Sequence, residues 1–456
     1  MPTQTPIAMK NQSSPFAIAA VVAAVVAASL LTACGGSDDG DTVVVDQNRI
    51  DVIRSDAPSL TALGSYNVGV KTLNLVNLKQ LDVVNANPDG TTPTYDRPLT
   101  VEVWYPGSLG AGQPAGGEYR AMTRDGKTSV SLFGQAVRDA AADPSGGPYP
   151  LVIISHGYPG NRYLLSHLGE NLASKGYVVV SIDHTDSNYE NIAAFGSTLL
   201  NRSLDQLFVL NEMAKLNAQD PGVTLKGLIN ANNTALIGYS MGGYGVLNTV
   251  GAGFTARSVG YSWGTANGAL AVRQQGNATY MASLDNRIKA AVAFAPWGYN
   301  QGFWDATGLA GVRTPMFFVA GSVDSVSGYA PGVRNLYEGV VNADRYLLTF
   351  ENANHNAGAP IPAPKETRTL TCGTGAGAFS CSEHYTDPVW DNVRMNNIAQ
   401  HFTTGFLNKY LKADAAMDAY LNLVPNAADG KGATYWKGFK PNTAVGLRLE
   451  KLPATN

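Results

Sequence analysis

The residues around Ser240 give the clearest indication of a catalytic residue in this sequence. Ser240 is the centre of GYSMG, residues 238–242, which fits the pattern Gly-X-Ser-X-Gly. A serine on a sharp turn between a strand and a helix presents its hydroxyl as a nucleophile, and flanking glycines keep that turn free of clashes. The apolar run TALI precedes the motif and the helical pattern MGGYGVLNTV follows it. This placement favours a nucleophile over a plain glycine-rich bend.

A nucleophilic serine needs a base, and the chain offers several histidines. His355, in ENANHNAG, follows the last apolar strand pattern and precedes a proline-rich stretch, so we predict that it takes the serine's proton. His167 and His401 fall within helical patterns and are expected to face solvent or packing partners. His156 is expected to shape its loop, and for His184 a metal or structural role stays open.

The base in turn needs a carboxylate that orients its ring and stabilises the imidazolium. Asp324, in FFVAGSVDSVSG, lies just beyond the next-to-last strand pattern, and we predict that it fills this role. Glu351, Asp344 and Asp305 are rival acids, of which Glu351 is too near the histidine in sequence. A loop aspartate in a salt bridge is the alternative for Asp324. The order serine, aspartate, histidine differs from that of chymotrypsin-like and subtilisin-like enzymes.

The oxygen of a substrate carbonyl becomes negative in such a reaction and needs preformed donors. The stretch ISHGYPGNR follows the third strand pattern, and we predict that the backbone N–H groups of Tyr158 and Met241 form this oxyanion hole. Trp297 and Tyr299, in FAPWGYNQGFW, are candidates for the lining of a substrate pocket. Ordinary core packing is the alternative for both aromatic residues.

The elements that must position these residues alternate between short apolar runs and helical patterns, which is typical of a parallel sheet with helical connections. The first two strand patterns alternate apolar with polar residues, as antiparallel edge strands do. The later ones are apolar throughout, as strands covered on both faces are. We therefore predict an α/β fold with a mostly parallel, eight-stranded sheet flanked by helices. The predicted strands are 66–75, 99–106, 149–157, 176–184, 234–240, 288–296, 315–324 and 345–355.

Helical patterns occupy the spaces between strands, at 162–176 and 203–216, and the longest, 389–411, follows the last strand. Residues 107–147 are rich in Gly, Pro and Ala and are predicted as a loop or excursion. Residues 251–287 form a long insertion after the serine's helix. This insertion is either a lid or wall over the site or a surface loop that packs on itself.

The N-terminal part of the chain carries the hydrophobic run PFAIAAVVAAVVAASLLTAC, residues 15–34, with a single cation before it. An uncleaved membrane-spanning helix is one interpretation. We predict a removed signal peptide, residues 1–33, because LTAC resembles the lipobox of bacterial lipoproteins, which implies lipidation of Cys34. GGSDDGD then suits a flexible tether, residues 34–60, before a catalytic domain at 61–456.

The residues around the cysteines indicate the compartment. Gly35 stands directly after the lipidated cysteine, where an acidic sorting residue is absent, so we expect an exported protein anchored by lipid in the outer membrane, at its periplasmic or surface face. On that oxidising route Cys372 and Cys381, in LTCGTGAGAFSC, are predicted to form a disulfide that closes a short loop. A metal site is less favoured, because only His384 is nearby.

Composition indicates a folded protein that does not bind nucleic acid. The chain has 456 residues, of which 45% are hydrophobic and 15% are charged, and its formal net charge is −3. These values support a sizeable core. No stretch of clustered Lys and Arg offers a groove for phosphates, so no nucleic-acid partner is expected.

Two stretches carry a family resemblance. HGYPGNRYLLSHLGENLASKGYVVVSIDHTDS and, further on, ALIGYSMGG are similar to the branch of the α/β-hydrolases that contains dienelactone-hydrolase-like proteins and the platelet-activating-factor acetylhydrolases. The likeness runs over residues 66–411. It implies a serine esterase without cofactor or metal, with Ser240 as nucleophile, His355 as base, and Tyr158 and Met241 as oxyanion donors.

The sequence departs from that family in two places. Dienelactone hydrolases proper carry cysteine as the nucleophile, where this chain has serine. Plasma-type acetylhydrolases have their aspartate directly after the sixth strand, where this chain has Ala295 and Pro296, so the acid is moved to Asp324. GYSMGG also resembles bacterial polyester-degrading hydrolases.

These observations predict hydrolysis of carboxylic esters, of short to medium chain length or aromatic, through an acyl-enzyme on Ser240. A polyester or lipid-ester depolymerase, or an acetylhydrolase, on the same triad is the alternative. A peptidase or acyltransferase would use the same residues. A non-catalytic surface lipoprotein that keeps the fold as a binding module is the competitor from another class.

Overall fold

The computed structural model describes residues 47–219, 224–423 and 436–455. The predicted signal peptide, the lipidation site Cys34 and the first part of the predicted tether lie outside these residues. None of the helices in the described ranges combines the length and apolar character that crossing a membrane requires.

A sheet of eleven strands runs through the described part of the chain, in the order β16-β13-β12-β11-β10-β8-β9-β3-β2-β6, with β7 paired to β3. The six neighbours from β9 to β13 are parallel, and β3 is antiparallel to both β9 and β2. The predicted mostly parallel α/β sheet is confirmed. The eight predicted strands are all present, as β2 (Asn67–Leu81), β3 (Thr94–Ser108), β8 (Tyr149–Ser155), β9 (Val178–Asp183), β10 (Ile229–Tyr239), β11 (Ile288–Phe294), β12 (Met316–Gly321) and β13 (Arg345–Phe350).

The alternation of side chains along β8 explains why this sheet has a core on each face. Leu151 and Ile153 belong to one hydrophobic core, whereas Val152 and Ile154 belong to the other, and all four are fully buried. A strand covered on both faces must be apolar throughout, as the sequence of β8 is.

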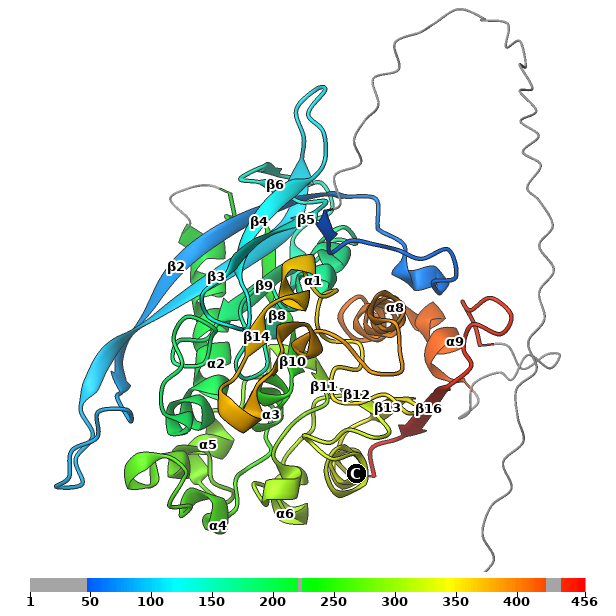
Figure 1. The fold of residues 1–456 in the computed structure, drawn as a ribbon. Helices are drawn as coiled ribbons and strands as arrows, with labels where there is room; N and C mark the ends of the chain where they lie inside the picture. Colours follow the sequence, from blue (N-terminus) through cyan, green and yellow to red (C-terminus); the bar gives the residue numbers. More distant parts are fainter. Residues whose placement is uncertain (1–46, 220–223, 424–435, 456) are drawn as a thin grey trace, which may run out of the picture. The chain divides into compact units, whose positions relative to one another are not determined.

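Helices cover both faces of the sheet (Figure 1). Apolar residues of α2 (Phe195–Gln219) and α3 (Met241–Thr249) join one core. Those of α1 (Ser166–Ala173) and α8 (Asn392–Leu411) join the other. The three predicted helices are therefore present, as α1, α2 and α8, and α2 begins earlier than its sequence pattern indicated.

The sheet extends beyond the eight predicted strands. At the edge next to β13, β16 (Leu447–Leu452) pairs in the antiparallel direction. Leu447 and Leu449 are buried, and Arg448 between them is partly exposed. The alternation of this edge strand covers only a few residues, so it is a weak sequence signal for a strand.

Residues 107–147, predicted as a loop or excursion, contain a hairpin. β4 (Gly117–Met122) and β5 (Ser129–Gly134) pair with each other and form a three-stranded sheet with β1 (Asn48–Arg49). The hairpin buries one side chain in two, including Tyr119, against the α1 side of the central sheet. Its glycines lie at the ends of the strands and not inside them, so composition alone was a poor guide.

The described part of the predicted tether is also ordered. β1 pairs with β5 in the parallel direction, and Ile50 is 3% exposed within the core on the α1 side. The compact unit accordingly begins at Gln47 and not at residue 61. The pairing of β1 with β5, the buried side chain of Ile50 and a hydrogen bond from Asn48 to Glu366 at 2.9 Å hold this segment on the domain.

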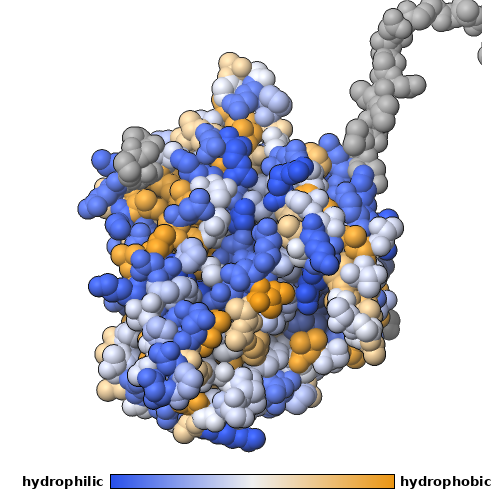
Figure 2. Space-filling view, turned by 60° about the vertical axis from the view of Figure 1, so that its left-hand side comes forward, coloured by the Kyte–Doolittle hydropathy of each residue, from blue (hydrophilic) through white to orange (hydrophobic). Residues whose placement is uncertain are grey.

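The insertion of residues 251–287 lies next to α3 (Figure 1) and contains three short helices, α4 (Ala256–Val259), η2 (Ala266–Arg273) and α5 (Ala278–Ala282). On the face shown in Figure 2, hydrophobic residues form small separate patches among hydrophilic ones, as on most soluble domains. Other short elements are β6 (Val137–Arg138), β7 (Ala141–Ala142), η1 (Ser59–Thr61), α6 (Ala306–Leu309), α7 (Asn335–Gly339), η5 (Lys365–Arg368), η6 (Gly375–Gly377), η8 (Ala415–Met417) and α9 (Asp418–Leu421).

Candidate active site

Ser240 lies on the turn between β10 and α3 and has an uncommon backbone conformation. Its φ of 53° and ψ of −112° are outside the regions that residues with a side chain prefer. Its N–H donates to the carbonyl oxygen of Phe294 at 2.9 Å. A Cβ on Gly238 would lie 2.3 Å from the Gly242 carbonyl group, and one on Gly242 would lie 1.9 Å from the carbonyl oxygen of Ser155. Both glycines of the motif are therefore needed for the turn.

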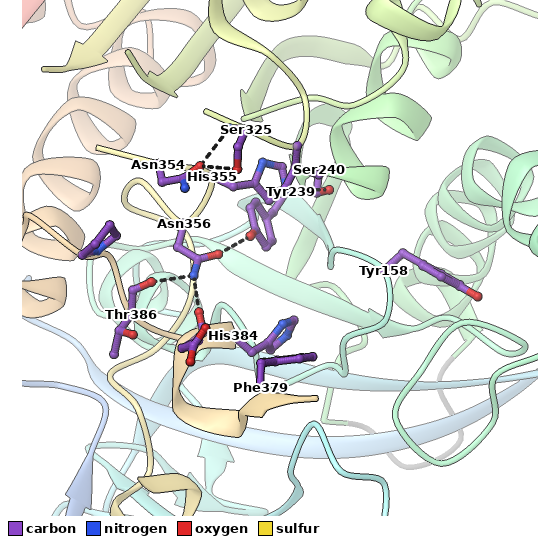
Figure 3. A pocket seen from close by; sticks show the side chains of 13 residues that line it. Tyr158, Tyr239, Ser240, Ser325, Asn354, His355, Asn356, Phe379, His384 and Thr386 are labelled. Atoms are coloured by element: carbon purple, nitrogen blue, oxygen red, sulfur yellow. Dashed lines mark hydrogen bonds between the residues drawn. The ribbon is translucent and has the colours of Figure 1, made fainter. Parts of the chain in front are cut away.

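His355 follows β13, and its ring lies beside Ser240 (Figure 3). Nε2 is 3.0 Å from Oγ of Ser240, and Nδ1 is 3.0 Å from Oδ2 and 3.1 Å from Oδ1 of Asp324. When Nδ1 carries the proton, its N–H donates a hydrogen bond to Asp324. Nε2 is then the acceptor for the hydroxyl of Ser240. The structure thus brings the three predicted residues into one hydrogen-bonded chain.

Asp324 lies buried in the loop after β12. Its Oδ1 accepts hydrogen bonds from the N–H groups of Val326 at 2.8 Å and Ser327 at 2.9 Å. Burial works against a charge on this carboxylate, but the hydrogen bonds from His355 and from the two N–H groups outweigh it, so the pKa of Asp324 is lowered. The carboxylate therefore stays ionised and holds the imidazole ring in place.

The rival acids have other partners. Glu351 forms an ion pair with Arg448 at 3.3 Å. Asp305 accepts from the backbone at the start of α6 and caps that helix, and Asp344 accepts from a backbone N–H near the end of the chain at 3.1 Å. Each of these carboxylates therefore serves a local contact away from His355.

The loop after β8 passes directly beside Ser240. A Cβ on Gly157 would lie 3.5 Å from the Cβ of Ser240 and 3.0 Å from the ring of Tyr239, so glycine allows this close approach. Tyr158 follows and lines a cavity at the site. Met241 is the first residue of α3, so its N–H has no acceptor within the helix. Both predicted oxyanion donors thus belong to backbone segments that meet at Ser240.

Arg202, on α2, holds this loop, and sequence reasoning did not single it out. Its guanidinium donates to the carbonyl oxygens of His156 and Gly157, the latter at 2.9 Å, and to Oγ of Ser187 at 2.8 Å. The side chain is 1% exposed, and burial lowers its pKa to about 9. In the sequence it stands just before the predicted helical pattern of residues 203–216, and only its buried position on the inward face of α2 distinguishes it.

A second Ser–His–Asp set lies beneath the same loop. His184 has Nε2 at 2.7 Å from Oγ of Ser155 and Nδ1 at 2.8 Å from Oδ2 of Asp205. All three residues are at most 1% exposed, and Asp205 also pairs with Arg97 at 2.9 Å. Burial lowers the pKa of His184 to about 3. Of the two roles left open for His184, the structure supports the structural one.

The remaining candidate histidines are buried as well. His156 donates from Nδ1 to the carbonyl oxygen of Gly157 at 2.7 Å, and its Nε2 accepts from the N–H of His184 at 3.1 Å. His167 in α1 and His401 in α8 face packing partners and not solvent, and burial lowers the pKa of each to about 3. Within the described ranges, no three His, Cys, Asp or Glu side chains gather as a metal site would need.

A cavity of about 590 Å³ opens beside Ser240. In Figure 3, Ser240 and His355 lie at one end of this cavity, Phe379 and His384 lie opposite them, and Tyr158 lies to one side. Aromatic rings and polar side chains line it together. Its volume is in the range of small-molecule sites.

Trp297 and Tyr299, the predicted pocket residues, are not among the described residues that line this cavity. The N–H of Trp297 donates to the carbonyl oxygen of Ser240 at 3.2 Å, but its ring contacts the ring of Phe195, with centroids 5.6 Å apart. Tyr299 lines a separate groove. Sequence position placed both residues near the nucleophile but could not give the direction of their side chains.

The wall of the cavity opposite Ser240 is the segment 371–388, here called the wall segment. It contains β14 (Thr371–Cys372), β15 (Phe379–Ser380) and η7 (Cys381–His384). Its side chains on the cavity are Phe379, Glu383, His384, Thr386 and Pro388. No motif in the sequence indicated this role.

The predicted disulfide is present and closes the wall segment. Cys372 and Cys381 are bonded to each other, and Cys372 is paired with Phe379 across the two short strands. His384 adds a hydrogen bond from the segment to the hydroxyl of Tyr189 at 2.6 Å. The bridge therefore supports side chains that face the cavity.

Asn356 connects the wall segment to the site (Figure 3). Its Nδ2 donates to the carbonyl oxygens of Glu383 at 3.0 Å and Thr386 at 2.7 Å. Its Oδ1 accepts from the hydroxyl of Tyr239 at 2.7 Å. Since Tyr239 precedes Ser240 in the chain and Asn356 follows His355, this one amide joins three parts of the site.

The fold and this geometry define an α/β-hydrolase with a Ser–His–Asp triad at the carboxyl edge of its sheet. The chain belongs to the family described as platelet-activating factor acetylhydrolase, isoform II, which matches residues 93–324. The match includes Ser240 and Asp324. His355 and the wall segment follow its end.

The chain is also similar to proteins with named activities. It is 24% identical to cutinase est1 of Thermobifida alba over 210 residues, which are 46% of this chain and 54% of that protein. It is 23% identical to bis(hydroxyethyl) terephthalate hydrolase of Streptomyces coelicolor over 236 residues, which are 52% of this chain and 59% of that protein. The chain thus spans just over half the length of these curated relatives.

Among solved structures, ferulic acid esterase from Streptomyces cinnamoneus has the same fold. The TM-score is 0.51 at 19% sequence identity, and the match covers 81% of this chain and 96% of the other.

Proposed function

We propose that this protein hydrolyses carboxylic esters through an acyl-enzyme on Ser240. The observation that carries the proposal is the chain of hydrogen bonds from Ser240 through His355 to Asp324, with 3.0 Å at each step. It ends at an open cavity, so a substrate can reach the serine's oxygen. The relatives named cutinase and bis(hydroxyethyl) terephthalate hydrolase support an ester as the substrate.

In the acylation step, Oγ of Ser240 attacks the ester carbonyl carbon while its proton passes to Nε2 of His355. The carbonyl oxygen becomes negative and accepts hydrogen bonds from the N–H groups of Tyr158 and Met241. The ester C–O bond then breaks, and the imidazolium returns the proton to the leaving alcohol. Asp324 stabilises the positive ring throughout.

Deacylation repeats the step with water in place of the serine. Nε2 of His355 removes a proton from water, and the resulting hydroxide attacks the acyl carbon. When the tetrahedral intermediate collapses, the proton goes to Oγ of Ser240 and the carboxylic acid leaves. The chain of three residues is restored without any external reactant besides water.

The cavity favours an ester with a compact or flat acyl group. Tyr158, Tyr239 and Phe379 provide aromatic contact, and the polar residues between them limit a long alkyl chain. Short to medium-chain or aromatic esters are therefore the proposed substrates. Depolymerisation of a polyester and removal of acetyl groups are the second candidates, supported by the names of the cutinase and terephthalate-ester relatives and by the acetylhydrolase family.

The proposal is tested with p-nitrophenyl acetate, butyrate and benzoate and with the matched p-nitroanilides. Ser240→Ala should lower kcat by on the order of 10⁶. Ser108→Ala, at an exposed serine at the end of β3, is the matched control and should keep full turnover. Turnover by Ser240→Ala at the wild-type rate would refute the assignment, and faster cleavage of anilides than of esters would indicate a peptidase.

We also propose export and attachment of lipid at Cys34, on the support of the LTAC sequence. The disulfide between Cys372 and Cys381 is consistent with an oxidising compartment. Cys34→Ser should move the protein from the outer-membrane fraction to the soluble fraction in cells that process lipoproteins. An unchanged distribution would contradict the proposal.

A further inference from the structure

A second groove lies at the carboxyl edge of the sheet, on the far side of Val326 from the catalytic cavity. Its volume is about 470 Å³. Three segments build it, namely the insertion of residues 251–287, the short helix η3 (Tyr299–Gln301) after β11, and η4 (Tyr329–Arg334) after β12. We call it the side groove. Because the loops after β11 and β12 flank the triad, the side groove belongs to the same face of the domain as Ser240.

An aromatic platform forms one wall of the side groove. The rings of Trp263 and Tyr261 are stacked, with centroids 4.8 Å apart and planes 17° from parallel. Phe303 supports both from behind, at 5.7 Å from Tyr261 and 5.9 Å from Trp263. The hydroxyl of Tyr261 donates to the carbonyl oxygen of Gln301 at 2.5 Å, which fixes the stack on η3. Trp263 nevertheless remains 47% exposed.

Polar side chains complete the side groove. Asn300 and Gln301 line it with amide groups, and Arg257 lines it with a guanidinium. An amide group both donates and accepts hydrogen bonds, and so does a hydroxyl group, so the two can pair in either direction. This combination of an open indole face with amides suits a ring that has an apolar face and a hydroxylated edge.

One hydrogen bond joins a residue of the side groove to a residue of the catalytic cavity. Nδ2 of Asn300, in the side groove, donates to the carbonyl oxygen of Val326 at 3.4 Å. Val326 itself lines the catalytic cavity and is 48% exposed. A ligand long enough to reach both sites would therefore pass over the exposed side chain of Val326.

We infer that the side groove binds a sugar ring of an acylated glycan whose ester lies at Ser240, an inference that rests on the proposed esterase function. A pyranose stacks its C–H face on an indole and pairs its hydroxyls with amides. Asn300 and Gln301 are exposed. The repeat of an aromatic polyester has acceptors but no donors, so it can pair with the N–H groups of these amides but not with their oxygens, whereas a sugar hydroxyl can pair with both. The chemistry of the groove therefore favours a glycan.

Kinetics with two substrates test the inference. Trp263→Ala should lower kcat/KM on acetylated xylan about tenfold or more, which is the effect of losing one stacked ring, about 1.4 kcal/mol. It should leave kcat/KM on p-nitrophenyl acetate within about twofold. Trp263→Phe should keep part of the activity on xylan. Leu78→Ala is the control, since Leu78 is 61% exposed on β2, away from both sites.

Binding is measured separately from turnover. Ser240→Ala protein should be retarded during electrophoresis through a gel that contains acetylated xylan, and Ser240→Ala with Trp263→Ala should not. An equal loss of activity on both substrates, no loss on xylan, or no binding of xylan by Ser240→Ala would overturn the inference. A loss on polyester film without a loss on xylan would overturn it in favour of an aromatic polymer.

Failure of the proposed function has a different signature. If Ser240→Ala keeps its turnover of p-nitrophenyl acetate, the esterase assignment fails, whatever Trp263→Ala does. If Ser240→Ala is inactive and Trp263→Ala behaves as the wild type on xylan, only the glycan site is rejected.

Discussion

The guanidinium of Arg202 donates a hydrogen bond of 2.9 Å to the carbonyl oxygen of Gly157, so a buried cation on α2 fixes the backbone just before Tyr158. The same guanidinium also bonds to His156 and Ser187. Three acceptors on one planar group define the orientation of the loop, because the donors of arginine are fixed relative to each other.

Arg202→Lys should therefore lower kcat on p-nitrophenyl butyrate about tenfold or more, with KM changed much less. Lysine keeps the charge but cannot reach both carbonyl groups, so the N–H of Tyr158 moves away from the developing oxyanion. Arg287→Lys, at a surface ion pair with Asp285, is the control. A thermal unfolding midpoint near that of the wild type, together with an unchanged kcat, would exclude a positioning role for Arg202.

Covalent labelling should separate the two Ser–His–Asp sets. Ser155 and Ser240 lie 2.7 and 3.0 Å from their histidine nitrogens, so hydrogen-bond geometry alone does not distinguish them. Access does, because Ser155 is fully buried and Ser240 faces a cavity. A fluorophosphonate should modify Ser240 only, as read by peptide mass spectrometry, and Ser155→Ala should still be labelled. Modification of Ser155 in the folded protein would contradict this assignment.

The buried histidines should make the protein less stable in acid. Burial lowers the pKa of His167 to about 3 from the ordinary histidine value of 6.5. Between these values the unfolded chain binds a proton that the folded chain does not, so the free energy of unfolding falls as pH falls. The folded protein loses up to about 1.4 kcal/mol per pH unit for this residue in that window.

His167→Leu should remove that part of the slope. Neither ring nitrogen of His167 has a hydrogen-bond partner among the described residues, so the change removes no hydrogen bond. Urea unfolding at pH 7 and pH 5 should show a smaller difference for the variant, by about 2 kcal/mol. Identical differences in the variant and the wild type would show that His167 is protonated in the folded protein.

Removal of the disulfide should change selectivity more than it changes basic turnover. With Cys372→Ser and Cys381→Ser, Phe379 and His384 lose the bridge that holds their segment, and the cavity no longer fits an aromatic acyl group. The ratio of kcat/KM for p-nitrophenyl benzoate to that for acetate should fall about tenfold. Phe379→Ala should shift the ratio in the same direction. A ratio unchanged in both variants would remove the wall segment from substrate selection.

The sequence was informative wherever a feature depends on neighbours in the chain. The strands and the motif at Ser240 are local patterns, since apolar runs and glycines act within a few residues. The base and the acid could be chosen because parallel strands end at one edge of a sheet, which brings the residues after β12 and β13 to the edge where Ser240 lies.

The features that escaped prediction depend on contacts between distant parts of the chain. The importance of Arg202 becomes visible only when its bonds to Gly157 are known. The wall segment has no local signature, because its role comes from the position of Phe379 and His384 opposite Ser240. Trp297 shows the same limit, since the sequence gives its place in the chain but not the direction of its ring.

The amide of Asn356 has a mechanical consequence. It ties Tyr239 to the backbone of the wall segment at Glu383 and Thr386, and it is itself the residue after His355. A ligand that displaces this wall therefore pulls at once on the neighbours of the nucleophile and of the base. We therefore expect that a bulky ligand that shifts the wall segment also shifts Oγ of Ser240 and the ring of His355. Such a ligand would bind tightly and still be cleaved slowly.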